Sequence, residues 1–154
     1  MGVDKSVDKT DLKILNLMLE KPEVKYKDLA KSLGLTIGTV HNRIKAMKAN
    51  KVIQQIVPDI DTKKLGYDIT ALINVLVKGG HLEVIEKKYS KHRNVSAVYD
   101  VTGNYDMLIV GKFRNTDDLN KFVKGLMAEE YVERTNTSLV LNIVKGVSAP
   151  FPLG

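Results

Sequence analysis

The hydrophobic pattern of the chain changes its period near residue 67, and this change predicts an α+β protein built in two parts. Before that point, apolar residues recur three or four positions apart, as Leu12, Leu15 and Leu19 do, which is the spacing of a helix with one buried face. From Ile69 to Val77 every second residue is apolar, which is the spacing of a strand with one buried face. We therefore predict a first domain over residues 1–57, a linker over 58–66 and a second domain over 67–154.

Local signals place three helices in the first domain. Asp8 and Thr36 have side chains that accept hydrogen bonds at the start of a helix, so we expect one helix to begin after each. A helix between them, about Lys27 to Leu33, is expected to end at Gly34, where a left-handed backbone is available. Asn50 tolerates the same conformation and is expected to end the third helix. Two short helices that meet at a glycine turn are typical of a helix-turn-helix.

Positive charge is concentrated in this first domain. The residues up to Val57 hold eleven Lys or Arg against six Asp or Glu, and no acidic residue lies between Asp28 and Asp59. Such an asymmetry indicates an acidic partner. A helix with a buried apolar side and a basic outer side fits the major groove of double-stranded DNA. A membrane surface is not favoured, because the segment lacks the Trp- and Phe-rich face of an interfacial helix.

The second domain is expected to follow the order strand, helix, strand, strand, helix, strand. The apolar residues that define these elements lie in 69–77, 82–89, 95–101, 107–113, 119–126 and 139–143. We expect Asn115 or Thr116 to cap the second helix, and Gly103-Asn104 to form the turn of a hairpin. This order is the ferredoxin-like βαββαβ arrangement. The β-rich stretch Val52–Val57 after the helix-turn-helix makes the first domain winged-like.

One face of such a sheet is not covered by its own two helices. The residues expected on that face are apolar: Leu72, Leu76, Leu108, Val110 and Val140. An apolar surface of this kind is typical of a protein interface, so we expect the face to pack against a second copy of the chain.

The composition argues against several classes of function. No cysteine is present, and His41, His81 and His92 are scattered without carboxylates at helical spacing, so we expect no metal. No phosphate loop, nucleophile elbow or dinucleotide fingerprint occurs, and we expect neither an enzyme nor a cofactor. No apolar run approaches the roughly 18 residues of a spanning helix, and the first residues are too polar for a signal peptide. We therefore expect a cytoplasmic protein without a membrane partner.

In the order and spacing of its motifs, nearly the whole chain resembles the Lrp/AsnC, or feast/famine, transcriptional regulators. The residues that carry the resemblance are Asp11–Leu15, Asp28–Ala30, Gly34–Thr36, Val40, Arg43–Lys45, Val52–Ile53, Leu65–Tyr67 and Thr102–Asp106. The chain departs from the family pattern at Asn50, where the family commonly has Gly, and at Gln55-Ile56, which replaces a glycine/aromatic pair. The resemblance implies a sequence-specific DNA-binding homodimer that assembles to tetramers or octamers and whose C-terminal domain senses an amino acid.

The predicted DNA-binding residues surround the third helix. They are Thr36, Gly38, Thr39, His41, Asn42, Arg43, Lys45 and Lys48. The early residues His41 and Asn42 suit base edges, whereas Thr36, Thr39, Lys45 and Lys48 suit phosphates. Arg43 could bind either DNA group or brace the fold, and Ile37 could contact a thymine methyl or belong to the core.

By resemblance, the amino-acid pocket lies between dimers and is bordered by the hairpin loop and by Arg134–Ser138 at the start of the last strand. The predicted effector-binding residues are Thr102, Gly103, Asn104, Tyr105, Asp106, Thr135, Asn136, Thr137 and Ser138. Asp106, hydroxyl groups and free loop amides supply acceptors for an ammonium group and donors for a carboxylate. If Lys124 lines the pocket, its charge favours a neutral or acidic effector. The plain alternative is that Gly103 and Asn104 only serve a tight turn.

Two other functions compete with a dedicated regulator. An architectural protein that binds DNA with little sequence specificity shares every feature described above, and only the ratio of specific to non-specific affinity separates the two. An RNA-binding βαββαβ module is less favoured, because Tyr99, Tyr105 and Phe113 are too few and too spread to stack bases.

Overall fold

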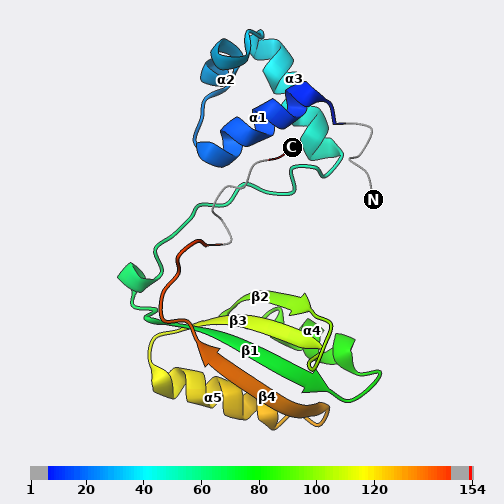
Figure 1. Cartoon of the computed structure of the whole chain (residues 1–154), viewed down its shortest axis with the longest axis vertical. Coiled ribbons are helices and arrows are strands. Elements are labelled where there is room, and N and C mark those ends of the chain that lie inside the picture. Colours follow the sequence, from blue (N-terminus) through cyan, green and yellow to red (C-terminus); the bar gives the residue numbers. More distant parts are fainter. Residues whose placement is uncertain (1–6, 147–152, 154) are drawn as a thin grey trace. The chain divides into compact units, whose positions relative to one another are not determined.

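The computed structural model describes residues 7–146 and 153, which form two compact units (Figure 1). One unit holds the chain up to Asp59 together with the described residues from Lys145 onward, and the other holds Ile60–Val144. The ends of the predicted domains, at 1–6, 147–152 and 154, lie outside the described residues. Within the described part of the chain, no helix is long and apolar enough to cross a membrane.

Three helices form the N-terminal unit: α1 (Lys9–Glu20), α2 (Tyr26–Leu33) and α3 (Ile37–Ala49). The predicted caps are confirmed, since the side chain of Asp8 accepts from the backbone of Thr10 and Asp11, and that of Thr36 accepts from Thr39. The helices pack around a small apolar core of Ile14, Leu29, Ala30, Val40, Ile44 and Met47. This core fixes which side of α3 faces outward.

The turn between α2 and α3 has the predicted chemistry. Gly34 adopts φ 66° and ψ 31°, and the backbone amide of Leu35 donates to the carbonyl of Ala30 at 2.9 Å. A side chain at Gly34 would be strained in this left-handed conformation. The glycine therefore lets the chain reverse within a few residues and bring α3 against α2.

The end of α3 differs from the prediction. Asn50 has φ −82°, and the left-handed residue is Lys51, with φ 59°. The amides of Val52 and Ile53 then donate to the carbonyl of Met47 at 2.9 and 3.1 Å, which closes the helix end. The stretch Val52–Val57 is not a strand, because its first two residues turn back onto the core of the unit instead of pairing.

The C-terminal unit is a four-stranded antiparallel sheet with two helices. A short 3₁₀ turn, Lys63–Leu65, precedes it, and its elements are β1 (Ile69–Val77), α4 (Leu82–Tyr89), β2 (Val95–Asp100), β3 (Met107–Phe113), α5 (Thr116–Met127) and β4 (Val132–Leu139). Figure 1 shows the strands side by side in the order β2-β3-β1-β4. All neighbouring strands are antiparallel. This topology confirms the predicted ferredoxin-like fold.

Both helices of this unit cover the same face of the sheet. Ile85 and Tyr89 of α4, with Phe122 and Leu126 of α5, are buried in one core with alternate residues of β1 and β3. Asn115 caps α5 by accepting from the backbone amide of Asp118 at 2.9 Å. The residues of opposite parity along β1 and β3, Leu72, Leu76, Leu108 and Val110, are only partly buried, which leaves an apolar face without helices.

The last strand was predicted too late in the chain. The structure places β4 at Val132–Leu139, whereas Leu141 and Ile143 lie beyond it and are exposed. The reason is the length of the neighbouring strand, because β1 begins at Ile69 and the amide of Val140 donates to the carbonyl of Thr70 at 2.9 Å. Beyond that contact, β1 offers no further backbone groups to pair with.

Candidate nucleic-acid interface and effector site

Helix α3, the predicted recognition helix that would contact DNA, is amphipathic in the predicted sense. Val40, Ile44 and Met47 are buried, whereas His41, Asn42 and Lys45 between them are exposed. Five of the predicted DNA-binding residues are exposed on this outer side: Gly38, His41, Asn42, Lys45 and Lys48. Because the apolar side of α3 is buried in the core of the unit, the helix presents a polar and basic surface to any partner.

The first turn of α3 is held by two threonines. The backbone amide of Thr39 donates to Oγ1 of Thr36 at 3.1 Å, and the two hydroxyl oxygens lie 2.8 Å apart. Thr36 thus satisfies one of the free amides at the helix start. The mutual hydrogen bond also orients the Thr39 side chain, which is partly buried.

Gly38 follows in the same turn, and no contact within the N-terminal unit requires a residue without a side chain at this position. A Cβ atom added there would meet only Oγ1 of Thr36, at 3.9 Å, which is ordinary van der Waals contact. Its backbone is helical, so no left-handed conformation demands glycine. A glycine in a helix reduces stability relative to alanine, and at Gly38 no contact within the unit offsets that loss.

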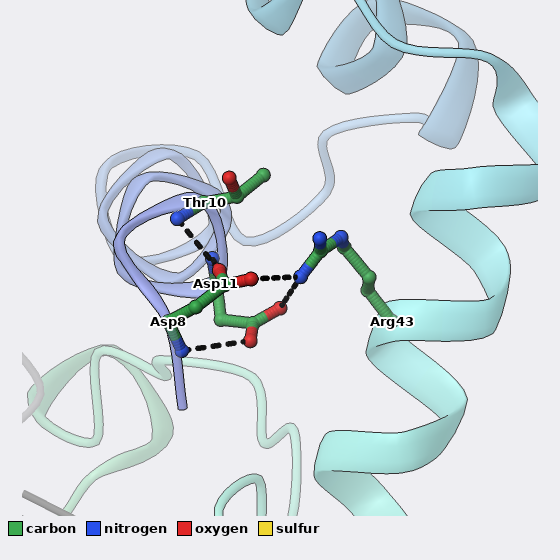
Figure 2. A network of polar contacts seen from close by, with 4 residues as sticks. All are labelled: Asp8, Thr10, Asp11 and Arg43. Carbon is green, nitrogen blue, oxygen red and sulfur yellow. Dashed lines mark hydrogen bonds and ion pairs between the residues drawn. The ribbon is translucent and has the colours of Figure 1, made fainter. Parts of the chain in front are cut away.

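Arg43 braces the fold. Its Nη1 lies 2.7 Å from Oδ2 of Asp8 and 3.0 Å from Oδ1 of Asp11, as Figure 2 shows. Asp8 and Asp11 also form a reciprocal capping box at the start of α1. The three side chains therefore tie the recognition helix to the first helix, and of the alternatives predicted for Arg43 the structure shows this one.

The electrostatics of this network agree with its geometry. The backbone amide of Asp11 is the largest influence that lowers the pKa of Asp8, and the Arg43 guanidinium lowers it further. The hydrogen bonds to Asp8 and Asp11 in turn raise the pKa of Arg43. The side chain of Asp11 is only 8% exposed, so Arg43 also compensates a nearly buried charge.

Tyr26 lies beside α3 and was not among the residues predicted from the sequence. Its ring lies 6.0 Å from that of His41 between centroids, with the planes tilted by 59°. Tyr26 opens α2 and is partly buried, while His41 is exposed on α3. A tyrosine fifteen positions before the histidine gives no signal in the sequence, because the turn at Gly34 alone brings them together.

The loop predicted to bind an effector connects β2 and β3 over residues 101–106. Thr102, Gly103 and Asn104 are exposed, and Gly103 has φ 118°, as a tight turn requires. Asp106 is anchored at its backbone, since its amide donates to Val75 at 3.0 Å and its carbonyl accepts from Val101 at 2.9 Å. Its carboxylate Oδ2 also accepts from the amide of Val77 at 2.9 Å.

Tyr105 connects this loop to the start of β4. The guanidinium carbon of Arg134 lies 5.1 Å from the centroid of the Tyr105 ring, which is a cation–π distance. Arg134 of β4 lies opposite Leu76 of the neighbouring strand β1, on the face without helices. Lys124 is exposed on α5, which covers the opposite face, so the cation placed beside the loop is Arg134.

The predicted residues of β4 are divided between the two faces of the sheet. Thr135 and Thr137 pair with Val75 and Ile73, whose side chains point toward the helices. Asn136 and Ser138 pair with Asn74 and Leu72 on the face without helices. Residues opposite each other in paired strands point to the same side of the sheet. A single pocket on one face can therefore be lined by Thr135 and Thr137 or by Asn136 and Ser138, but not by all four.

In the described part of the chain, no three His, Asp or Glu side chains are grouped to hold a metal ion.

Two family models match the chain. The model of the Lrp/AsnC ligand binding domain matches residues 70–149, and a winged helix-turn-helix DNA-binding model matches residues 7–54. An HTH-type transcriptional regulator of Pyrococcus horikoshii is 42% identical over 90% of this chain and 94% of its own length. The HTH-type transcriptional regulator FL11 of Pyrococcus furiosus is 32% identical over 90% of this chain and 92% of its own.

Solved structures show the same architecture. E. coli AsnC has a TM-score of 0.81 at 26% identity and covers 92% of this chain and 98% of its own. A transcriptional regulator of Neisseria meningitidis in complex with L-Met has a TM-score of 0.87 at 22% identity, with 94% and 96% covered. The chain belongs to the Lrp/AsnC family of transcriptional regulators, with a helix-turn-helix DNA-binding domain and an Lrp/AsnC ligand-binding domain.

Proposed function

We propose that the protein is a sequence-specific regulator that binds double-stranded DNA through α3 and responds to an amino acid bound by its C-terminal domain. The observation that carries the DNA-binding part is the outer side of α3. There, the exposed His41 and Asn42 in the first half of the helix are followed by the exposed Lys45 and Lys48 in the second half. A recognition helix contacts bases with its N-terminal residues and the backbone with later ones.

The roles follow from the chemistry of each side chain. Asn42 suits a bidentate contact with adenine, and His41 suits a guanine acceptor, each good bidentate contact being worth about 1–3 kcal/mol of discrimination. Lys45 and Lys48 suit phosphates and fix the register of the helix without selecting sequence. Thr36 and Thr39 suit phosphate at the helix start, where free amides favour an anion.

Selection from a randomised duplex pool tests this assignment. The full-length protein and its His41→Ala, Asn42→Ala and Lys45→Ala variants are each taken through the same rounds and sequenced. We expect the His41 and Asn42 variants to lose preference at particular base pairs, and the Lys45 variant to keep the preference with lower affinity for every duplex. An unchanged ranking of site variants by Asn42→Ala would contradict its role, and a wild type that enriches no sequence would favour an architectural protein.

The effector part of the proposal is supported by the ligand-binding family model and by the L-Met complex of the Neisseria relative. The chain offers suitable groups around Tyr105: exposed loop amides at residues 102–104, the carboxylate of Asp106 and the guanidinium of Arg134. A positive charge beside the loop disfavours a basic side chain. We propose a neutral or acidic amino acid, and tighter calorimetric binding of lysine or arginine than of glutamine or glutamate would contradict this.

Assembly of copies is the third part of the proposal. The apolar face of the sheet, with Leu72, Leu76, Leu108 and Val110, supports a homodimer, and further contacts between dimers give a tetramer or octamer. An effector that binds one assembly more tightly than another shifts the population toward that assembly. DNA affinity then changes through this difference in effector affinity, with no direct contact between effector and DNA. Sedimentation with and without ligand measures this shift.

The first experiment combines these parts in one assay. The DNA upstream of the protein's own gene is used in a gel shift against competitor DNA, with and without a mixture of amino acids. Competitor-resistant shifts that the mixture alters are expected. Shifts abolished by competitor and unaffected by the mixture would favour the architectural alternative, and no shift at low salt, where backbone contacts are strongest, would overturn DNA binding itself.

A further inference from the structure

Ile37 is an apolar residue left outside the core at the start of the recognition helix. It is the first residue of α3, and 52% of its surface is exposed. The other large apolar residues of α3, Val40, Ile44 and Met47, are at most 3% exposed. The structure thus excludes the core as the explanation for Ile37.

Ile37 lies among the residues proposed to contact DNA. The hydroxyls of Thr36 and Thr39 are 2.8 Å apart and bonded to each other. Gly38 adds no side chain, and a Cβ there would make only an ordinary van der Waals contact with Oγ1 of Thr36, at 3.9 Å. His41 lies one helical turn beyond Ile37 on the same side, where its ring lies beside Tyr26.

We propose that Ile37 is a specificity-determining residue that contacts the 5-methyl group of a thymine in the major groove. Thymine is the base that presents a methyl group there, and apolar side chains recognise it by contact. The missing side chain at Gly38 lets the first turn of α3 come close enough for a side chain at the helix start to reach a base edge. This inference rests on the proposed binding of DNA through α3.

The charge of the surrounding surface favours DNA over a protein partner. Along the outer side of α3, Ile37 is followed by His41, Lys45 and Lys48, all exposed. No acidic residue lies within α3 or between residues 29 and 58. A cationic surface with one apolar contact at its end fits the edge of a thymine flanked by phosphates.

Replacement of thymine by uracil removes only the methyl group and so tests the contact directly. The duplex most enriched by the full-length wild type is synthesised with uracil in place of each thymine in turn, and dissociation constants are measured for wild type, Ile37→Ala and Ile56→Ala. Ile56 is the matched control, because it is 54% exposed and lies outside the recognition helix.

At one or more thymines, uracil should weaken wild-type binding about three- to fivefold, as expected for one buried methyl group. Ile37→Ala should bind the thymine and uracil duplexes equally at that position, while Ile56→Ala should keep the wild-type ratio. Circular dichroism of the Ile37 variant checks that α3 still forms. Wild-type binding without any methyl dependence, or the same dependence in Ile37→Ala, would overturn the assignment of Ile37 but leave DNA binding intact. A wild type that binds no selected duplex would overturn both.

Discussion

Replacing Gly38 by alanine should stabilise the protein and at the same time weaken its binding to DNA. In a helix interior an alanine is favoured over glycine by about 0.5–1 kcal/mol, which is an upper limit for Gly38 as the second residue of α3. At Gly38 nothing opposes this gain, because the added Cβ would meet only Oγ1 of Thr36 at 3.9 Å. For a domain of roughly 60 residues, that free energy corresponds to a rise in Tm of about 2–8 °C.

The effect on DNA has the opposite sign because the same space is proposed to admit the edge of the major groove. A methyl group on the outer side of the first turn would hold the helix away from the bases and loosen several contacts together. We expect at least a tenfold loss of affinity for the wild type's preferred duplex, measured by fluorescence anisotropy. Calorimetry on the full-length variant gives the Tm of its unfolding.

Gly125→Ala is the matched control. Gly125 lies in α5, and an added Cβ would meet nothing within 4 Å, so the same gain in helix stability is expected. This variant should raise the Tm of the C-terminal unit without changing DNA affinity. If Gly38→Ala binds the preferred duplex as tightly as the wild type, the argument that its missing side chain serves DNA is refuted. If it lowers the Tm, the packing argument is refuted.

Three further predictions concern Arg43, Glu86 and Asp106. Arg43→Ala should lower the Tm of the N-terminal unit more than Lys45→Ala, because the Arg43 side chain pairs with Asp8 and Asp11 whereas Lys45 is exposed on the outer side of α3; equal values in calorimetry would contradict the bracing role. The neighbouring carboxyl group of Asp100 is the main cause that raises the pKa of Glu86 to about 7. Glu86 therefore stays protonated to a higher pH in the folded protein than in the unfolded chain, and the stability that this proton provides is lost as pH rises through that value. The Tm of the wild type should therefore fall relative to that of Glu86→Gln as the pH rises from about 4.5 to 7, and parallel curves over that range would contradict the shift. Asp106→Asn retains an oxygen that can accept from Val77 and should keep its wild-type Tm, while losing the carboxylate proposed for the effector ammonium; unchanged amino-acid affinity by calorimetry would exclude that role.

Much of the fold could be predicted because its signals are local. The caps Asp8 and Thr36, the glycine turn and the alternation along β1 each depend on a few neighbouring residues, and the structure confirms them. The sequence of β4 gives no such signal, since between Val132 and Leu139 every residue is polar. That strand forms because β1 has an unpaired edge, and its position depends on where β1 begins and ends.

The contacts within the predicted sites were less accessible to sequence reasoning. Arg43 and Asp8 are 35 positions apart, and only the packed helices bring them within 2.7 Å. The carboxylate of Asp106 is held by Val77, 29 positions earlier, because β1 and β3 are neighbours. Residue types indicated which side chains can bind DNA or a small molecule, while the tertiary structure decides which of them the fold itself uses.

The polar sequence of β4 also affects the behaviour of the sheet at its edges. Both edge strands carry features that discourage the addition of a foreign strand. Near its start, β4 carries the adjacent charges Glu133 and Arg134, beside an irregularity of register at Leu76/Val77. β2 has a similar irregularity between Val95 and Ala97. Each edge is therefore a poor template for intermolecular β-pairing, which protects the protein from edge-to-edge aggregation while its apolar sheet face stays available.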